Sequence, residues 1–77
     1  MEEQIYGILF KEGRLRPPLS QNDQLFDHGL DSPGVVDVMM ALEETFDVIF
    51  PDEFLNRRTF STINSIVAAI KKIKHIA

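Results

Sequence analysis

The chain has 77 residues and no cysteine, so one small apolar core has to stabilise its fold without disulfides or thiolate metal sites. A domain of this size buries only about 60% of the surface that its unfolded chain exposes. The hydrophobic content of 44% is nevertheless that of a globular protein. We therefore expect a single domain over residues 1–77. So small a domain has little room for a deep cleft, which argues against an enzyme.

Apolar residues recur at helical spacing in three segments, which predicts an all-α fold. The first helix is expected over residues 3–11 with Gly13 as its stop, the second from Ser32 to Phe46, and the third over residues 62–74. A short helical turn is expected over residues 52–58, with Phe54 and Leu55 facing inward. The predicted core stripes are Ile5, Ile8 and Leu9; Val35, Val38, Leu42 and Phe46; and Ile63, Ile66, Val67, Ile70 and Ile73.

A long loop separates the first two predicted helices. Residues 13–31 are rich in Gly, Pro, Ser, Asn and Asp, which are turn formers. Loops of this length are unusual in small domains unless they are functional or packed down. Leu19, Leu25, Phe26 and Leu30 are expected to fix this loop to the core. The predicted fold is thus a small bundle of three main helices plus a short helix.

Charge is segregated along the chain. No Lys or Arg occurs between Pro17 and Asn56, whereas that stretch contains nine acids. They are Asp23, Asp27, Asp31, Asp37, Glu43, Glu44, Asp47, Asp52 and Glu53. An anionic surface disfavours nucleic acid and suits basic partners, although solubility alone is an alternative explanation. Because Met1 is followed by two acids and no apolar run is long enough to span a bilayer, we expect a cytoplasmic protein that does not bind membranes.

Ser32 lies at the predicted start of the second helix. Ser is a favoured N-cap and Pro33 fits the first helical position. A phosphodiester on Ser32 would lie near the helix dipole and near the two backbone N–H groups that follow Pro33. The alternative is an ordinary N-cap, worth about 1 kcal/mol.

Residues around Ser32 resemble a known family. Gly29-Leu30-Asp31-Ser32 is similar to the G-x-D-S attachment motif of acyl and peptidyl carrier proteins, and the similarity continues in one register through Met40-Ala41-Leu42-Glu43-Glu44 and Phe50-Pro51-Asp52-Glu53. The resemblance implies an acyl-carrier-protein-like fold and a 4′-phosphopantetheine arm transferred from coenzyme A to Ser32. It also implies that the chain is a carrier, not an enzyme, and presents a thioester-linked acyl or aminoacyl group.

The resemblance also implies roles for neighbouring residues. Asp31 would help a phosphopantetheinyl transferase and its Mg²⁺ to engage Ser32. Further partners would be an acyl- or amino acid-activating ligase and downstream transferases with basic docking patches. The carrier itself is expected to be a monomer. The residues expected to contact partners are Asp37, Met39, Met40, Glu43, Glu44, Arg57 and Arg58. Core filling is the alternative role for both methionines.

Two features depart from the usual pattern of the family. Pro33 and Gly34 stand where an apolar and a polar residue are usual, and Gly34 is expected to loosen the first helical turn. The segment Phe54-Leu55-Asn56-Arg57-Arg58-Thr59-Phe60 instead resembles that of stand-alone aminoacyl carrier proteins, which are charged by free-standing ligases. Fatty acyl, polyketide and aminoacyl cargo all stay open. The aromatic residues Phe26, Phe46, Phe50, Phe54 and Phe60 favour a small one.

Two functions other than that of a carrier have to be weighed against the same residues. An unmodified acidic helical module that binds a basic partner would use the same second helix. A small hydrolase with Ser32 as nucleophile lacks a base, because neither His28 nor His75 has the partners of a triad. No metal site is expected, since the acids lack the spacing of a calcium loop.

Overall fold

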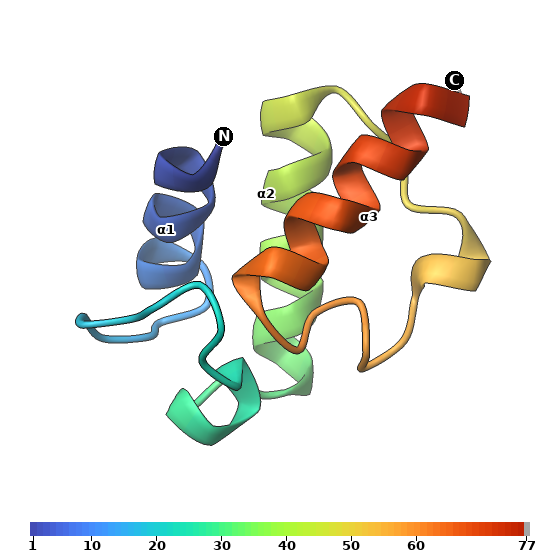
Figure 1. Ribbon diagram of the computed structural model, residues 1–77. Helices are drawn as coiled ribbons and strands as arrows, with labels where there is room; N and C mark the ends of the chain where they lie inside the picture. The colour runs from blue at the N-terminus through green and yellow to red at the C-terminus, as the bar shows by residue number, and fades with distance from the viewer. Residues whose placement is uncertain (77) are drawn as a thin grey trace.

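The computed structural model describes residues 1–76, and three α-helices dominate it: α1 (Glu2–Lys11), α2 (Ser32–Phe46) and α3 (Ile63–Ile76). Two 3-10 turns, η1 (Leu25–His28) and η2 (Asp52–Phe54), lie in the connections. Helices α1 and α2 run antiparallel, and α1 packs against both α2 and α3 (Figure 1). These 76 residues contain no strand, and no helix among them is long and apolar enough to cross a membrane.

The predicted all-α bundle is confirmed, with differences in its short elements. The turn expected over residues 52–58 is limited to η2, because Asn56 folds the chain back on itself after it. The turn η1 interrupts the segment that was expected to be a loop throughout. Its end is marked by Gly29, whose φ of 105° is accessible to glycine at little cost.

The predicted stripes meet in one core. Its fully buried side chains include Ile5 and Leu9 from α1, Val38 and Leu42 from α2, and Ile63, Ile66 and Ile70 from α3. Each side chain of this kind contributes about 1.5–3 kcal/mol by leaving water. Ile8, Phe46 and Val67 are half-buried at the edge of this core. Leu55 was predicted to face inward, which is wrong: 46% of it is exposed, because the chain leaves the core surface after Phe54.

The long first connection is packed down, as the sequence predicted. Leu25 and Leu30 are buried, and Leu19 and Phe26 pack half-buried against the core. Two backbone hydrogen bonds fasten the connection to the start of α3: the Leu25 N–H donates to Ser61 O (2.8 Å), and Asn64 N–H donates to Gln21 O (3.2 Å). This connection therefore positions the residues that precede α2.

A polar turn shapes the same connection. The Ser20 N–H donates to Asp23 Oδ2 at 2.8 Å, and this bond is the main reason that the pKa of Asp23 lies below its usual range. His28 Nε2 lies 3.6 Å from the same oxygen. His28 is the last residue of η1, and its side chain is exposed.

Two glycines provide a test of the packing. An added Cβ at Gly7, in the middle of α1, would meet nothing within 4 Å, whereas one at Gly13 would lie 2.8 Å from Leu9 O and 3.2 Å from Val38 Cγ2. We expect Gly7→Ala to raise the free energy of unfolding by about 0.5–1 kcal/mol. Gly13→Ala should lower it by about 1–3 kcal/mol. Urea denaturation followed by circular dichroism measures both, and equal effects would contradict the packing described.

Candidate functional site

The N-terminus of α2 is capped by Asp31, not by Ser32. Asp31 has an extended backbone, and its Oδ1 accepts a hydrogen bond from the Gly34 N–H at 2.8 Å. Its carbonyl oxygen accepts from the Val35 N–H, also at 2.8 Å. The predicted cap is therefore wrong by one residue: Ser32 and Pro33 occupy the first two helical positions. The Ser32 side chain is exposed and has no capping role.

With Asp31 as the cap, fewer backbone N–H groups are available to an anion on Ser32 than the sequence predicted. The N–H groups of Gly34 and Val35 were expected to bind an anion on Ser32, but both donate to Asp31. The expected looseness of the first turn is also wrong. Gly34 is buried, and a Cβ there would lie 2.9 Å from Asp31 Oδ1 and 3.3 Å from Leu30 Cδ1. Glycine thus allows the Asp31 carboxylate to approach the helix and close its first turn.

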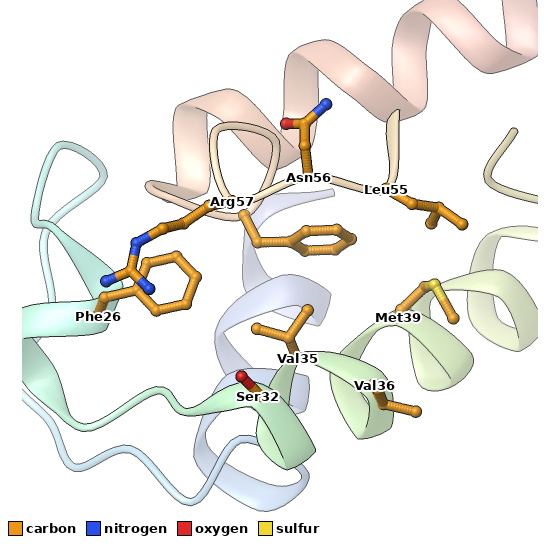
Figure 2. Close-up of a pocket in the computed structure, with 9 residues that line it drawn as sticks. Phe26, Ser32, Val35, Val36, Met39, Leu55, Asn56 and Arg57 are labelled. Carbon is orange, nitrogen blue, oxygen red and sulfur yellow. The ribbon is translucent and has the colours of Figure 1, made fainter. Parts of the chain in front are cut away.

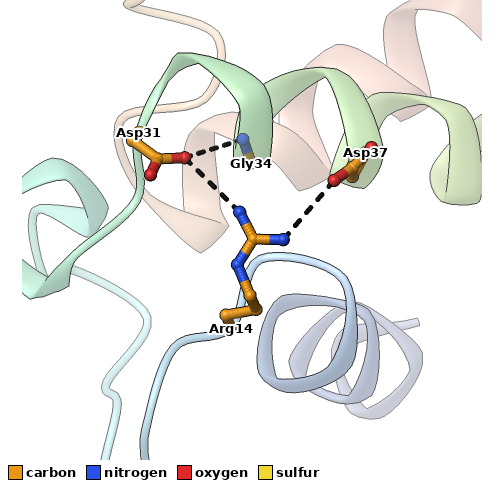
Figure 3. A network of polar contacts seen from close by, with 4 residues as sticks. All are labelled: Arg14, Asp31, Gly34 and Asp37. Carbon is orange, nitrogen blue, oxygen red and sulfur yellow. Dashed lines mark hydrogen bonds and ion pairs between the residues drawn. The ribbon is translucent and has the colours of Figure 1, made fainter.

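A second partner of Asp31 comes from the segment that follows α1. Arg14 Nη2 lies 3.8 Å from Asp31 Oδ1, and Arg14 Nη1 lies 3.6 Å from Asp37 Oδ2 (Figure 3). One guanidinium thus spans two carboxylates that were predicted to serve partner enzymes. The sequence did not predict this role of Arg14, because nothing in the local pattern around it points to residues so far along the chain.

A surface groove of about 350 Å³ lies beside Ser32, between α2 and the segment that precedes α3 (Figure 2). Its apolar lining comprises Phe26, Val35, Val36, Met39, Leu55 and Phe60. Ser32, Asn56 and Arg57 are its polar members. The groove therefore offers an apolar surface next to the Ser32 hydroxyl, with one cation at its edge.

The cation at the groove is held in place by an aromatic ring. The Arg57 guanidinium carbon lies 3.8 Å from the centroid of the Phe26 ring, within the range of a cation–π interaction. Asn56 shapes the backbone here: its Oδ1 accepts from the Thr59 N–H (3.0 Å) and the Thr59 hydroxyl (3.2 Å). Sequence analysis named Arg57 but missed the structural role of Asn56, which the turn-forming tendency of Asn could have indicated.

The residues predicted to contact partners lie in different surroundings. Met40 is 59% exposed, and Glu44, Arg57 and Arg58 are exposed as well. Met39 is half-buried, lines the groove and packs against the core. Glu43 is also partly buried.

The Glu43 carboxylate has a structural role. Its Oε2 accepts a hydrogen bond from the Phe50 N–H at 2.9 Å, which holds the linker after α2. In that linker Val48 and Phe50 are buried, whereas 80% of Ile49 is exposed. A role for Glu43 toward partners stays a prediction.

These features define a class: a small helical protein with an exposed serine hydroxyl at the start of a helix, an acid before it and an apolar groove beside it. Such a site suits covalent attachment of a long, flexible group. A family model described as "Phosphopantetheine attachment site" matches residues 12–70. The chain belongs to this family. It is therefore a carrier protein that bears covalent 4′-phosphopantetheine and presents acyl or aminoacyl groups, as the sequence predicted.

Individual relatives support membership of this family. The chain is 38% identical to an aminoacyl carrier protein of Agrobacterium fabrum over 76 residues, which cover 95% of this chain and 92% of the relative. It is 34% identical to a D-alanyl carrier protein of Streptococcus uberis over 56 residues, which cover 71% of each chain.

Solved structures give the same result. A crystal structure of an engineered Bradyrhizobium japonicum glycine:[carrier protein] ligase, complexed with a carrier protein from Agrobacterium tumefaciens and AMP, matches with a TM-score of 0.87 and 38% identity. The match covers 92% of this chain and 99% of the other. A solution structure from Agrobacterium tumefaciens matches over the full length of both chains, with a TM-score of 0.77 and 37% identity.

The residues of this chain fit the phosphopantetheine group. The Ser32 hydroxyl is exposed and is not needed to cap α2, so esterification would break no structural hydrogen bond there. The adjoining groove provides apolar surface for the methylene groups of the arm, and Arg57 at its edge provides a positive charge.

Stability measurements test whether Asp31, and not Ser32, caps α2. We expect Asp31→Ala to lower the free energy of unfolding by about 1 kcal/mol, because the Gly34 N–H loses its acceptor. Asp31→Asn should retain most of the stability, since Asn caps equally well. Ser32→Ala should change it by less than about 0.5 kcal/mol. Urea denaturation of the three variants measures these values, and a larger loss for Ser32→Ala than for Asp31→Ala would refute the assignment.

Proposed function

We propose that Ser32 is the residue to which phosphopantetheine is attached, and that the cargo is an aminoacyl group. The observation that carries the proposal is the position of Ser32: its exposed hydroxyl is free of the cap and borders the apolar groove. The aminoacyl and D-alanyl carrier proteins among the relatives support the cargo.

The attached group supplies a terminal thiol, on which the cargo is held as a thioester. This chain would provide the surface on which the arm rests. Val35, Met39 and Leu55 in the groove would cover apolar parts of the arm, and the Arg57 guanidinium would face its phosphodiester. The cation–π contact with Phe26 restricts where that guanidinium can lie, which reduces the entropy lost on pairing.

A small cargo is consistent with the core. Side chains of Leu42 from α2, Ile66 from α3 and Phe60 from the segment before α3 are almost completely buried in the core. A long acyl chain would have to displace such side chains, and cavities or overpacking in a core typically cost about 1–3 kcal/mol or more. An aminoacyl group needs no such space, because it remains at the end of the arm.

The partners that follow from this function are a phosphopantetheinyl transferase, an amino acid-activating ligase and downstream transferases. The structural relative bound to a glycine:[carrier protein] ligase supports the second of these. Asp31, Asp37 and Glu44 would face basic patches on partners, and Met40 would add apolar contact. Arg57 at the groove and the exposed Arg58 that follows it would contact partners from the other side. We further propose that the chain is not itself an enzyme. Its single domain over residues 1–77, its monomeric state and its cytoplasmic location stay predictions.

Attachment at Ser32 is tested by intact-mass analysis. The apo chain is incubated with coenzyme A, Mg²⁺ and a broad-specificity phosphopantetheinyl transferase. We expect one phosphopantetheine adduct on the wild type and on Ser20→Ala, a control at another exposed serine, and none on Ser32→Ala. An adduct on Ser32→Ala would place the arm elsewhere. No adduct on the wild type with several transferases would favour the unmodified interaction module.

The size of the cargo is tested by loading two arms with the same transferase, one ending in an aminoacyl group and one in a long acyl chain. We expect the aminoacyl form to keep the methyl NMR signals of Leu42 and Ile66 within the shifts seen on attachment of the bare arm. The long chain should either remain outside the core and leave these signals unchanged, or lower the melting temperature. A melting temperature raised by the long chain, together with shifted core methyl signals, would instead indicate a fatty-acyl carrier.

A further inference from the structure

Arg14 is held in an unusual backbone conformation beside the acids of α2. Its φ of 58° lies in the left-handed region, which favours glycine and asparagine over arginine. Both neighbours are fixed in the core: Gly13 and Leu15 are buried, and the Leu15 N–H donates to Leu9 O at 3.1 Å. The backbone at Arg14 is therefore positioned by packing, and its guanidinium extends toward α2.

The guanidinium lies between Asp31 and Asp37, 3.8 Å and 3.6 Å from their nearest oxygens (Figure 3). About 60% of the Arg14 side chain is exposed, as is about half or more of each carboxylate. Ion pairs so exposed contribute little to folding, typically a factor of about two to five in an equilibrium. Their larger effect is on the surface itself, since one positive charge offsets part of two negative ones.

We propose that Arg14 is an intramolecular counter-ion that competes with basic side chains of partner enzymes for Asp31 and Asp37. The inference rests on the proposed role of these acids in docking. A Lys or Arg of a phosphopantetheinyl transferase that approaches Ser32 has to displace the guanidinium or share the carboxylates with it. Arg14 thereby weakens attraction between this carrier and strongly basic partners. Partners that rely on apolar contact are affected less, so Arg14 shifts the selectivity of the carrier toward them.

Arg16 provides a matched control for Arg14. It is exposed, carries the same charge two residues away, and takes part in none of the ion pairs found within residues 1–76. Arg14→Gln and Arg16→Gln change the net charge equally, so a difference between them reports the contact with Asp31 and Asp37. At position 14, Gln bears about the same cost of the left-handed backbone as Arg does, so Arg14→Gln should keep the fold of the wild type.

The experiment measures binding of the apo chain to a transferase with a basic docking patch, and the rate of modification, at low and high salt. We expect Arg14→Gln to bind about twofold to fivefold more tightly than Arg16→Gln at low salt, with a parallel rise in kcat/KM. The difference should vanish near 1 M salt, where the Debye length is about 3 Å. Arg14→Lys should resemble the wild type more closely, because it keeps the charge.

A double-mutant cycle with Asp37→Asn separates the role of Arg14 from the docking role of Asp37. We expect Asp37→Asn to weaken binding more in the Arg14→Gln background than in the wild type, since only there is the carboxylate free of its internal partner. Equal binding by Arg14→Gln and Arg16→Gln, while Asp37→Asn still weakens binding, would overturn the role of Arg14 alone. No effect of Asp37→Asn in either background would overturn the docking role of Asp37 itself.

Discussion

The Asp31 carboxylate is the interaction on which the site depends. By accepting the Gly34 N–H it closes the first turn of α2, and it thereby takes over the capping role that Ser32 would otherwise have. The serine is left at the first helical position with an exposed hydroxyl. A hydroxyl that both capped the helix and served as an attachment point would lose its capping hydrogen bond once a group was attached to it. Division of the two tasks between neighbouring residues would let the helix persist after the proposed modification of Ser32.

The structure at the start of α2 accounts for two residues that depart from the usual pattern of the family. Gly34 has no Cβ to collide with Asp31 Oδ1, so its cost in helix propensity is offset by a well-formed cap. Pro33 lacks the N–H that would have no intrahelical partner in any case. Neither residue loosens the start of α2, and both leave Ser32 accessible on the side of the groove.

The sequence predicted the fold because its information is periodic. The stripes that contain Ile5, Val38 and Ile66 are local patterns, and each became a buried face. Ser32 was proposed through a motif and its role stays a prediction, whereas the cap was misplaced by one residue because Asp and Ser are equally good N-caps. Arg14 and the pairing of Arg57 with Phe26 were missed, since both join segments far apart in the chain. No spacing rule reports contacts that only tertiary packing creates.

The two arginines divide the surface around Ser32. Arg14 lies on the side of α2 that faces α1 and offsets the acids there, whereas Arg57 lies across the groove on the other side. Val36 and Met40 on α2, and Leu55 across the groove, are exposed apolar side chains. Under the proposed function, a partner that approaches Ser32 would meet these apolar side chains together with two cations that already have partners within the chain, so shape and apolar contact would add to charge in determining which partners fit.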